Sequence, residues 1–485
     1  MTSATIDRRA AAATAGGAIG SGEGPAGAGA ILNRAELLAT GNAVLRRHAL
    51  DIAEAGIAAA SPALAARRAI ALDGDRLRLG SRNYDLAGTG RVFVVGAGKA
   101  TFPIAEVVDA VLGRRIHKGL VVCKRGQAGH LGHIEMIVAD HPVPTAASRE
   151  AAARTVALLE EVRAGDLVIA CFTGGSSSLF VAPAPGISLD DKAEANRALL
   201  TCGANIVEIN AVRKHISTVK GGRLVRGLPA GVRLVNLTVS DVIGERLDCI
   251  TCPSVHDTST FEDARATLHK YGLWDRLPRS VTGHLRAGPA SGRSATADDL
   301  AHIDRDDLLL VTTDAACVGA AEAARRAGFT PLILSTLFEG ESGALGRTFG
   351  AIAREVLARG RPLPMPCALI GGGETTVTIM GAAGLGGPNQ EFAAAAALEI
   401  QGCDDVVALG LDTDGTDGPT PHAGGLVDGS TVATAVGRGI DLHAALRDHD
   451  VAPALERSGH VIRTGNTGTN VNDLKLVLVG RPRPA

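Results

Sequence analysis

Leu167 to Phe180 reads LVIACFTGGSSSLF, an apolar run that stops at Thr173 and gives way to two glycines and three serines. A short apolar run that ends at glycines is typical of a buried strand followed by a turn and a helix. Such a turn offers backbone N–H groups and hydroxyl groups at one point, which suits a phosphate. An ordinary strand-to-helix turn explains the stretch equally well, so the rest of the chain has to decide between the two.

Other predicted strands end in a similar way. Arg91 to Gly98, RVFVVGAG, is an apolar run that breaks at its glycines and is followed by Lys99 and a predicted helix over 101–112. Val232 to Val239 is a further apolar run, and it ends at Ser240-Asp241. Strands that alternate with helices predict an α/β fold with largely parallel sheets. An Asp at the carboxyl end of a strand lies where open α/β sheets bind their ligands.

The first glycine turn lacks the pattern of a nicotinamide-binding site. The dinucleotide motif needs G-x-G-x-x-G or A, and here Thr101 occupies the third place after Gly96 and Gly98. The next predicted strand ends at Lys124-Arg125, where the ribose of NAD would need an acid. Lys99 leaves the turn in front of a helix, so it is well placed to meet a phosphoryl group during transfer.

Composition limits the ligands and the compartment. The chain has 485 residues, of which 46% are hydrophobic, and this is enough for two or three domains. Lys plus Arg number 49 against 51 Asp plus Glu, so no overall charge recruits nucleic acid or an anionic membrane. Most of the eight cysteines are isolated in apolar stretches, and no apolar run reaches membrane-spanning length. We therefore expect a cytoplasmic protein without a zinc or redox site.

A basic segment lies between residues 208 and 222. Arg213, Lys214 and Lys220 concentrate cationic donors at a predicted helix end that leads into two glycines. A solvated basic face is the usual explanation of such a run. The alternative is a binding site for a small acid, because Arg offers a planar fork for carboxylate or phosphate groups.

An acidic loop follows the predicted strand over 406–411. It reads DTDGTDGPT and places Asp412, Asp414 and Asp417 among glycines. No bidentate Glu closes the loop as in a calcium-binding EF-hand, so Mg²⁺ with retained waters fits this spacing better. Simple Asx turns are the alternative interpretation.

The composition also divides the chain into segments. Residues 1–30 consist mainly of small residues, and we expect a disordered tail because such a segment cannot offset the entropy lost on ordering. We expect a first α/β domain over 31–285, a polar linker over 286–305 and a second α/β domain over 306–485.

Eight short motifs, in this order, together resemble the class II glycerate kinases, the MOFRL family, from about residue 31 to residue 479. They are VVGAGKA at 94–100, HPVP at 141–144, GGSSSL at 174–179, VRKHISTVKGG at 212–222, SDVIG at 240–244, GGGETTV at 371–377, GGPNQE at 386–391 and DGTDGPT at 414–420. The resemblance implies phosphorylation of D-glycerate to 2-phosphoglycerate with ATP and Mg²⁺. It also implies two three-layer α/β domains, with the MOFRL region over about 365–480 and the active site in the cleft between them. A small-molecule substrate is implied, without nucleic acid or membrane, and a homodimer is compatible with it.

The resemblance also implies roles for individual residues. Lys99 matches the catalytic lysine, and Asp241 is the candidate that orients or deprotonates the substrate hydroxyl group. Substrate would be bound by Arg213, Lys220 and Ser177. ATP would be bound by Gly98, Gly174, Gly175, Ser176, Ser177, Ser178, Glu374 and Asn389, and Mg²⁺ by Asp414 and Asp417.

Two departures from the family pattern bear on the substrate more than on the fold. Many members carry Arg before the Asn-Gln-Glu triplet, where this chain has Pro388. Many also carry Ile-Ala-Ser-Gly-Pro where this chain has ITCPS at 250–254. Relatives are often labelled hydroxypyruvate reductases, so an NAD(P)H-dependent reductase is the alternative enzyme. A catalytically silent protein that binds a sugar acid or a nucleotide is the alternative from another class.

Overall fold

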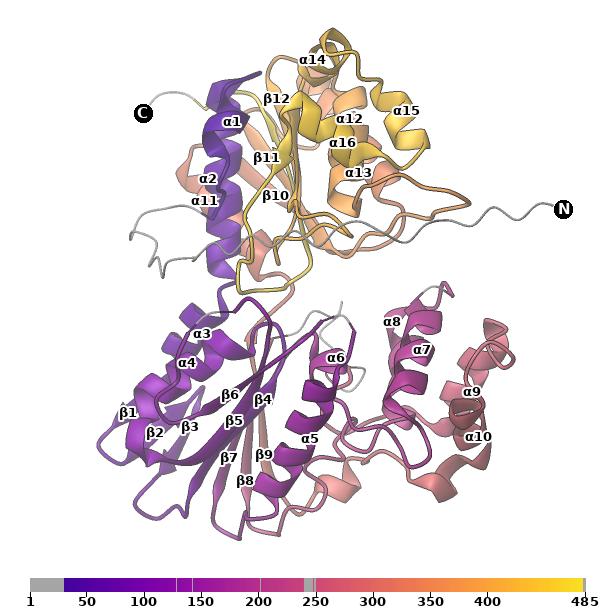
Figure 1. Cartoon of the computed structure of the whole chain (residues 1–485). Helices are drawn as coiled ribbons and strands as arrows, with labels where there is room; N and C mark the ends of the chain where they lie inside the picture. Colours follow the sequence, from indigo (N-terminus) through magenta and orange to yellow (C-terminus); the bar gives the residue numbers. More distant parts are fainter. Residues whose placement is uncertain are drawn as a thin grey trace, which may run out of the picture.

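Two lobes, each built on one six-stranded sheet, make up the part of the chain that the computed structural model describes (Figure 1). The described residues are 30–127, 129–141, 143–200, 202–239, 247 and 250–482. We call the lobe that contains strands β4 to β9 the first lobe and the lobe that contains strands β10 to β15 the second lobe.

The sheet of the first lobe is parallel throughout. Its strands are β4 (Val92–Ala97), β5 (Ile116–Lys124), β6 (Glu135–Ala139), β7 (Leu167–Phe172), β8 (Arg233–Val239) and β9 (Asp304–Val311). They lie in the order β6-β5-β4-β7-β8-β9, and all neighbouring pairs are parallel. The central strands β4 and β7 are buried along their whole length, because helices cover both faces of a parallel sheet. The prediction of a buried strand before the glycine and serine turn is confirmed.

Helices cover both faces of this sheet. One face carries α3 (Pro62–Ala69) and α4 (Thr101–Leu112), and a small antiparallel sheet packs beside them. That small sheet consists of β1 (Ile70–Asp73), β2 (Arg76–Leu79) and β3 (Arg82–Asp85). The other face carries α5 (Ala146–Leu159). A separate apolar cluster joins α7 (Leu189–Leu200), α8 (Ile206–His215), α9 (Phe261–Lys270) and α10 (Arg279–Ala287), which lie together at one side of the lobe (Figure 1).

The sheet of the second lobe differs from the prediction in strand direction. Its strands are β10 (Thr330–Phe338), β11 (Cys367–Gly373), β12 (Val406–Asp412), β13 (Gly424–Asp428), β14 (Val461–Ile462) and β15 (Asp473–Val479). They lie in the order β10-β11-β15-β12-β13-β14. The pair of β10 and β11 is parallel, and the other described pairs are antiparallel. The α/β class is thus confirmed, but the last strand, β15, runs antiparallel between β11 and β12, so this sheet is mixed.

Helices also cover both faces of the second sheet. One face carries α12 (Ser342–Arg359), α13 (Pro388–Glu399), α14 (Thr431–Gly437), α15 (Leu442–Arg447) and α16 (Val451–Ser458). The other face carries α1 (Arg34–Leu38), α2 (Ala43–Ala59) and α11 (Ala315–Arg326).

The lobes do not follow the predicted domain boundaries. β9 begins at Asp304 and pairs with β8, so it belongs to the first sheet, although we expected residue 306 to begin the second domain. α2 precedes the first sheet in the sequence, but it packs on α11, β12 and β15 of the second lobe. Strand pairing and helix packing therefore interleave the two halves of the sequence. The division into independently folding domains stays a prediction.

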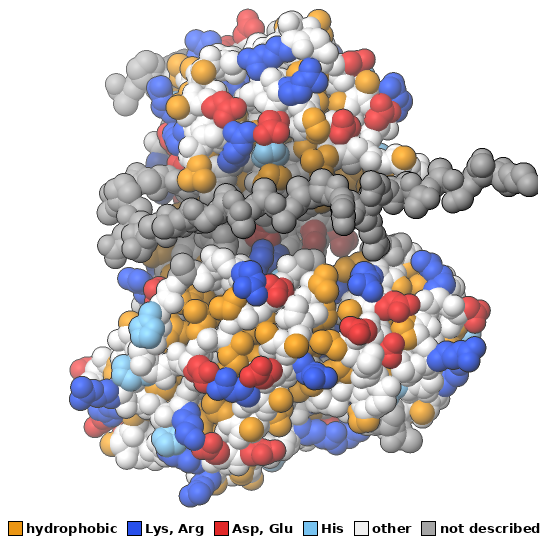
Figure 2. All heavy atoms as spheres, in the orientation of Figure 1, with side chains coloured by type: hydrophobic (Ala, Val, Ile, Leu, Met, Phe, Trp, Pro, Cys, Tyr) orange, Lys and Arg blue, Asp and Glu red, His pale blue; other side chains and the backbone are white. Residues whose placement is uncertain are grey.

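Charges and cysteines are dispersed over the described structure. On the face shown in Figure 2, basic and acidic side chains are interspersed over both lobes, in keeping with the balanced composition. The described cysteines are free thiols, and Cys249 lies outside the described residues. Among the described helices, none is by itself long and apolar enough to cross a membrane, and one bent pair, α2 with α3, has the length and composition for it.

Candidate active site

Turns from both sheets meet between the lobes. In the first sheet β4 and β7 are parallel neighbours, so the turns that follow them lie at the same edge. In the second sheet Asp473, the first residue of β15, pairs with Gly373 at the end of β11 and with Asp412 at the end of β12. Because β15 is antiparallel to both neighbours, its beginning lies at the edge where they end.

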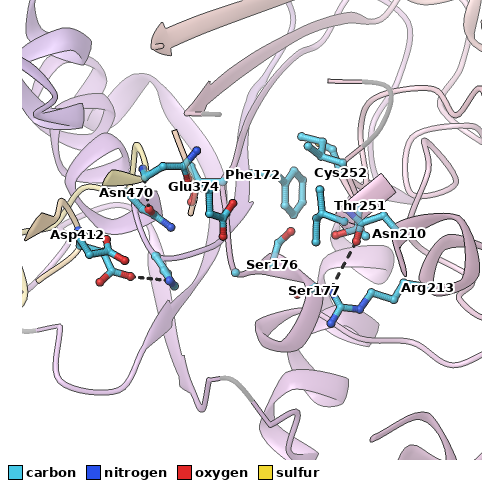
Figure 3. A pocket seen from close by; sticks show the side chains of 18 of the residues that line it. Phe172, Ser176, Ser177, Asn210, Arg213, Thr251, Cys252, Glu374, Asp412 and Asn470 are labelled. Atoms are coloured by element: carbon cyan, nitrogen blue, oxygen red, sulfur yellow. Dashed lines mark hydrogen bonds and ion pairs between the residues drawn. The ribbon is translucent and has the colours of Figure 1, made fainter. Parts of the chain in front are cut away.

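One cavity of about 210 Å³ is lined by residues from both edges. Figure 3 shows Asp412 and Asn470 of the second lobe on one side, Arg213 and Thr251 of the first lobe on the other, and Ser176 between them. The first lobe contributes Lys99, Phe172, Thr173, Gly174, Gly175, Ser176, Ser177, Ile206, Asn210, Arg213, Ile250, Thr251 and Cys252. The second lobe contributes Glu374, Asp412, Asp414, Asn470, Asn472 and Asp473.

Lys99 and Asp414 connect the two lobes directly. Nζ of Lys99 lies 2.7 Å from Oδ2 of Asp414. The backbone N–H and the hydroxyl group of Thr416 donate to the other oxygen of Asp414, at 2.9 and 2.7 Å. Burial opposes the ionisation of Asp414, but the Lys99 ammonium and the Thr416 donors outweigh it and lower the pKa of Asp414 below its usual value. The two side chains therefore form an ion pair at neutral pH.

Glycines allow the two turns of the first lobe to pack against each other. A Cβ atom at Gly98 would lie 2.1 Å from Oγ1 of Thr173, and one at Gly175 would lie 3.0 Å from Cγ of Lys99. The N–H group of Lys99 donates to the carbonyl oxygen of Gly174 at 2.8 Å. Lys99 is thus held against residues 174–178, which we call the serine turn.

His141 lies beside the same turn. A Cβ atom at Gly175 would be 3.3 Å from Cδ2 of His141, so the imidazole is close to the cavity wall. Burial and the charges of Lys99 and Lys124 lower the pKa of His141 to about 4. The ring is therefore neutral at pH 7 and adds no charge to the site.

Arg213, near the end of α8, forms the cationic side of the cavity. The residue is 8% exposed, and burial lowers the pKa of Arg213 to about 10, which leaves the guanidinium charged at pH 7. Nη1 lies 3.5 Å from Oδ1 of Asn210, and Nε has no hydrogen-bond partner among the described residues. A buried donor without a partner is costly unless a ligand accepts from it. Arg213 therefore fits a carboxylate or phosphate group of a ligand.

Carboxylates form the opposite side of the cavity. Burial raises the pKa of Asp412 well above its usual value, and the neighbouring Asp414 and Asp473 raise it further. A nearby cation would stabilise the charged form of such a group. The described residues contain no group of three His, Cys, Asp or Glu side chains arranged around one metal position. One or two carboxylates suffice for Mg²⁺, however, because phosphate oxygens and water complete its coordination.

Most of the predicted site residues lie at this cavity. Lys99, Gly174, Gly175, Ser176, Ser177, Arg213, Glu374 and Asp414 line it. Gly98 lies behind the lining, against Thr173, and Ser178 is buried with its hydroxyl group 3.3 Å from the carbonyl oxygen of Gly175. Asp241, the predicted base, lies outside the described residues.

Three predicted residues have other positions. Lys220 is buried beneath the serine turn, with Nζ 3.0 Å from the carbonyl oxygen of Ser176. Asp417 accepts hydrogen bonds from the backbone N–H groups of Asn389 and Gln390, at 2.9 and 2.8 Å, and from both side-chain amides, at 3.1 and 3.0 Å. Asp417 thus accepts from the first turn of α13, to which Asn389 belongs, and its oxygens are already occupied by N–H donors. Of the three acids in the loop, Asp412 and Asp414 line the cavity.

Several residues that line the cavity were not among the predicted ligands. Asp412 directly follows a predicted strand, and that position was a usable signal. Asp473 and the preceding Asn470 and Asn472 reach the cavity because β15 inserts between β11 and β12, which no local pattern reveals. Asn472 also has a φ of +65°, which is uncommon for residues other than glycine.

Pro388 has a structural position in this chain. It is the first residue of α13, and proline suits this position because an N–H group there would have no acceptor within the helix. Its carbonyl oxygen accepts from the hydroxyl group of Ser342 at 2.5 Å. Pro388 is not one of the described residues that line the cavity.

Comparison of the sequence with known proteins gives matches over most of the chain. Residues 48–286 match a domain of unknown function (DUF4147), and residues 367–473 match the MOFRL family. The glycerate 2-kinase of Pyrococcus horikoshii is 38% identical over 444 residues, which cover 90% of this chain and 99% of that protein. The D-glycerate 2-kinase of Thermotoga maritima is 40% identical over 393 residues, which cover 80% and 91%. A protein of Agrobacterium vitis named a hydroxypyruvate reductase is 39% identical over 394 residues, which cover 81% and 88%.

The fold agrees with these matches. The crystal structure of a glycerate kinase from Thermotoga maritima resembles this chain with a TM-score of 0.75 at 37% identity, covering 90% of this chain and 99% of that chain. The similarity therefore extends over both lobes and the cavity that they share. With the MOFRL match in the second lobe and close to two fifths of the residues identical to those of two glycerate 2-kinases, the chain belongs to the glycerate 2-kinase family.

Proposed function

We propose that this protein transfers the γ-phosphoryl group of ATP to the 2-hydroxyl group of D-glycerate. The observation that carries the proposal is the 2.7 Å contact of Lys99 with Asp414, which joins a lysine in a glycine turn of one lobe to the acidic loop of the other. The relatives named glycerate 2-kinase and D-glycerate 2-kinase support this choice of reaction and substrate.

The reaction requires positioning and charge neutralisation more than covalent help from the protein. The bond between the γ-phosphorus and the oxygen that bridges it to ADP breaks while the substrate oxygen bonds to phosphorus. Lys99 neutralises charge on the transferring group, and the serine turn holds phosphate oxygens through N–H groups and the hydroxyl groups of Ser176 and Ser177. The proton of the substrate hydroxyl group goes to a base, and Asp241 is our candidate from the sequence.

The substrate carboxylate binds on the cationic side of the cavity in this proposal. Arg213 offers a charged guanidinium whose Nε has no partner among the described residues. Ser177 and Thr251 line the same part of the cavity and add hydroxyl groups. Lys99 lines the same cavity, so a substrate held by its carboxylate at Arg213 would share that cavity with the lysine that we assign to the phosphoryl group.

Mg²⁺ fits the carboxylate side of the cavity. The residues that would hold it are Asp412 and Asp414, since both line the cavity and Asp412 is a buried acid with two acidic neighbours. When bound with ATP, Mg²⁺ would neutralise the phosphate oxygens. Asp414 would then exchange its contact with Lys99 for the cation, and Lys99 would turn to the phosphoryl group.

A coupled assay of ADP release tests the proposal. D-glycerate with ATP and Mg²⁺ is expected to yield ADP and 2-phosphoglycerate, and the product isomer is identified by phosphorus NMR. D-lactate, which keeps the carboxylate and the 2-hydroxyl group, and 3-hydroxypropionate, which keeps the 3-hydroxyl group, serve as matched substrates. Phosphorylation at the 3-position would refute the assignment of the carboxylate to Arg213. Binding of ATP without any phosphorylated product would indicate a silent relative instead.

The names of two relatives also favour hydroxypyruvate reduction as a second candidate. The turn after β4 carries Thr101 where a nicotinamide site needs glycine or alanine, and β5 ends at Lys124 where that site needs an acid. Oxidation of NADH or NADPH by the same preparation with hydroxypyruvate, without ADP release from ATP and glycerate, would replace the kinase proposal with this one.

A further inference from the structure

Lys220 has no access to the cavity, yet it contacts the turn that we assign to phosphate. The residue is 0% exposed, and its Nζ donates to the carbonyl oxygen of Ser176 at 3.0 Å. The same carbonyl oxygen accepts from the N–H group of Phe180 at 3.1 Å. Ser176 itself lines the cavity. The ammonium group of Lys220 is therefore separated from a ligand at the serine turn by one residue.

The groups that face Lys220 within the described part of the chain include no carboxylate. Arg213 approaches from α8, Lys192 from α7 and Cys252 from the segment after β8. Nζ of Lys192 is likewise buried and donates to the carbonyl oxygen of Ile216 at 3.0 Å. Among the described residues, no carboxylate forms an ion pair with either lysine. Buried cations without a counterion are costly, so a function at this place has to explain them.

We propose that Lys220 is a positioning residue of the phosphoryl-transfer site: it holds the carbonyl group of Ser176, and its charge favours an anion at the serine turn. This inference rests on the proposed function, because it takes the serine turn as the anion site. Lys220 does not touch the substrate in this arrangement. It acts through the backbone of Ser176, and the bound anion is the counterion that the described residues do not supply.

The protonation of Lys220 gives the inference a distinctive consequence. Burial and, to a smaller extent, the charge of Arg213 lower the pKa of Lys220 to about 7, and Cys252 opposes this shift. A bound anion stabilises the ammonium form and so raises this pKa. Near and above pH 7, anion binding should therefore take up a proton, and affinity should fall as the pH rises through the pKa of the free protein.

Calorimetric titration of the full chain with sulfate and with D-glycerate measures this proton uptake. The titrations are repeated in buffers of different ionisation enthalpy, and sulfate is chosen because it does not titrate between pH 6 and 9. For the wild type we expect about half a proton taken up per bound anion at pH 7, and more at pH 8. No uptake at either pH would overturn the proposal.

Three variants separate positioning from a purely structural role. Lys220→Met should weaken binding of both anions by at least about tenfold at pH 6.5, because one nearby charge is lost, and should abolish proton uptake. Lys220→Arg keeps a permanent charge, so it should restore affinity without proton uptake. Lys192→Met is the matched control: it removes a neighbouring buried lysine whose Nζ contacts the carbonyl oxygen of Ile216 and not the serine turn, so it should keep both the anion affinity and the proton uptake.

Urea unfolding of each variant checks the fold, and replacement of a buried cation by Met is often neutral or stabilising. If Lys220→Met binds both anions like the wild type while ADP is still released from ATP and glycerate, the inference falls and the proposed function stands. If no ADP is released but sulfate binding still takes up a proton through Lys220, the proposed function falls and the inference stands as a property of an anion site.

Discussion

At the scale of single residues, we expect the contact of Lys99 with Asp414 to matter more for turnover than for the stability of the fold. The two residues are 315 positions apart, and their side chains are 22% and 12% exposed. A partly exposed ion pair contributes on the order of 1 kcal/mol or less to stability. In the proposed reaction, the same positive charge would face the developing phosphoryl oxygens, where a preorganised charge stabilises the transition state strongly. Substitution of Lys99 should therefore affect turnover much more than folding.

Lys99→Ala is expected to lower turnover by about 100-fold or more, the scale for removal of one preorganised charge. The midpoint of thermal unfolding should stay within a few degrees of the wild type. ADP release and circular dichroism measure the two effects. Lys118→Ala is the control: Lys118 lies in β5 of the first sheet and forms an exposed ion pair with Glu161, which follows α5, so this variant should leave turnover unchanged. Retention of wild-type turnover in Lys99→Ala would remove Lys99 from the mechanism.

Asp412→Asn and Asp417→Asn should have opposite effects, although the two residues belong to one loop. Asp412 is a buried acid whose pKa is raised by burial, Asp414 and Asp473, so an amide there relieves repulsion and keeps or increases stability. Loss of the Asp412 carboxylate should lower activity about tenfold or more at limiting Mg²⁺. In Asp417→Asn an amide replaces a carboxylate that accepts from four N–H groups, so the free energy of unfolding should fall by about 1–3 kcal/mol.

Activity titrated with Mg²⁺ and urea unfolding distinguish the two variants. A weakened Mg²⁺ response in Asp417→Asn, with a normal response in Asp412→Asn, would restore the metal role that the sequence first assigned to Asp417. The sequence alone could not show which way Asp417 points. Spacing shows that three acids share a loop, but it does not show that the loop turns Asp417 toward the start of α13.

At the scale of helices and strands, the sequence predicted individual elements better than it predicted which strands pair. The apolar runs of β4 and β7 and the helix over 101–112 could be found because burial on both faces leaves a continuous apolar run. The direction of β15 could not be predicted, because parallel and antiparallel strands can have the same apolar sequence pattern. The place of β9 in the first sheet depends likewise on its pairing with β8, which is a long-range contact.

The helix α2 shows how one buried ion pair fixes such a long-range placement. Arg46 in α2 is 0% exposed and contacts Asp428 at the end of β13, with Nε 2.7 Å from Oδ2. The N–H group of Asn42, just before α2, donates to the same oxygen at 2.9 Å. Ser430 donates to the other oxygen of Asp428. These contacts attach an N-terminal helix to a sheet formed by the C-terminal part of the chain.

The stability contributed by Asp428 should depend on pH in a defined range. Burial opposes its ionisation, but Arg46, Ser430 and Asn42 outweigh it and lower the pKa of Asp428 from 3.8 to about 2. Because the pKa is lower in the folded state, this stability is present above about pH 4 and is lost as the pH falls through 2. The shift corresponds to about 2 kcal/mol at pH 6 and about 1 kcal/mol less at pH 3.

Urea unfolding at pH 6 and pH 3 tests this prediction. The difference in free energy of unfolding between the wild type and Asp428→Asn should shrink at the lower pH. Asp51 is also in α2, and Asp51→Asn removes only its partly exposed ion pair with Arg34 of α1, so this variant should stay close to the wild type at both pH values. A difference for Asp428→Asn that is equal at the two pH values would show that the carboxylate charge does not stabilise α2.

At the scale of the whole molecule, neither lobe contains a complete site. Lys99, Arg213 and the serine turn belong to the first lobe, whereas Asp412 and Asp414 belong to the second. The sequence motifs indicated the chemistry of each part, but only the arrangement of the lobes unites them in one cavity. Nucleotide, Mg²⁺ and substrate bound together in this cavity should then stabilise both lobes, because between them they would contact residues of each lobe.

Hydrogen exchange of the full chain with Mg²⁺, ADP and D-glycerate measures this coupling. We expect slower exchange in 98–101 and 173–178 of the first lobe and, in the same titration, in 412–416 and 470–473 of the second. At ligand concentrations one hundred times the dissociation constant, the free energy of unfolding should rise by about 2.7 kcal/mol. Lys99→Ala and Asp412→Asn should each weaken the protection in both lobes, because the ligand bridges them, whereas Lys118→Ala should not. Protection confined to one lobe in the wild type would show that the shared cavity is not where the ligands bind.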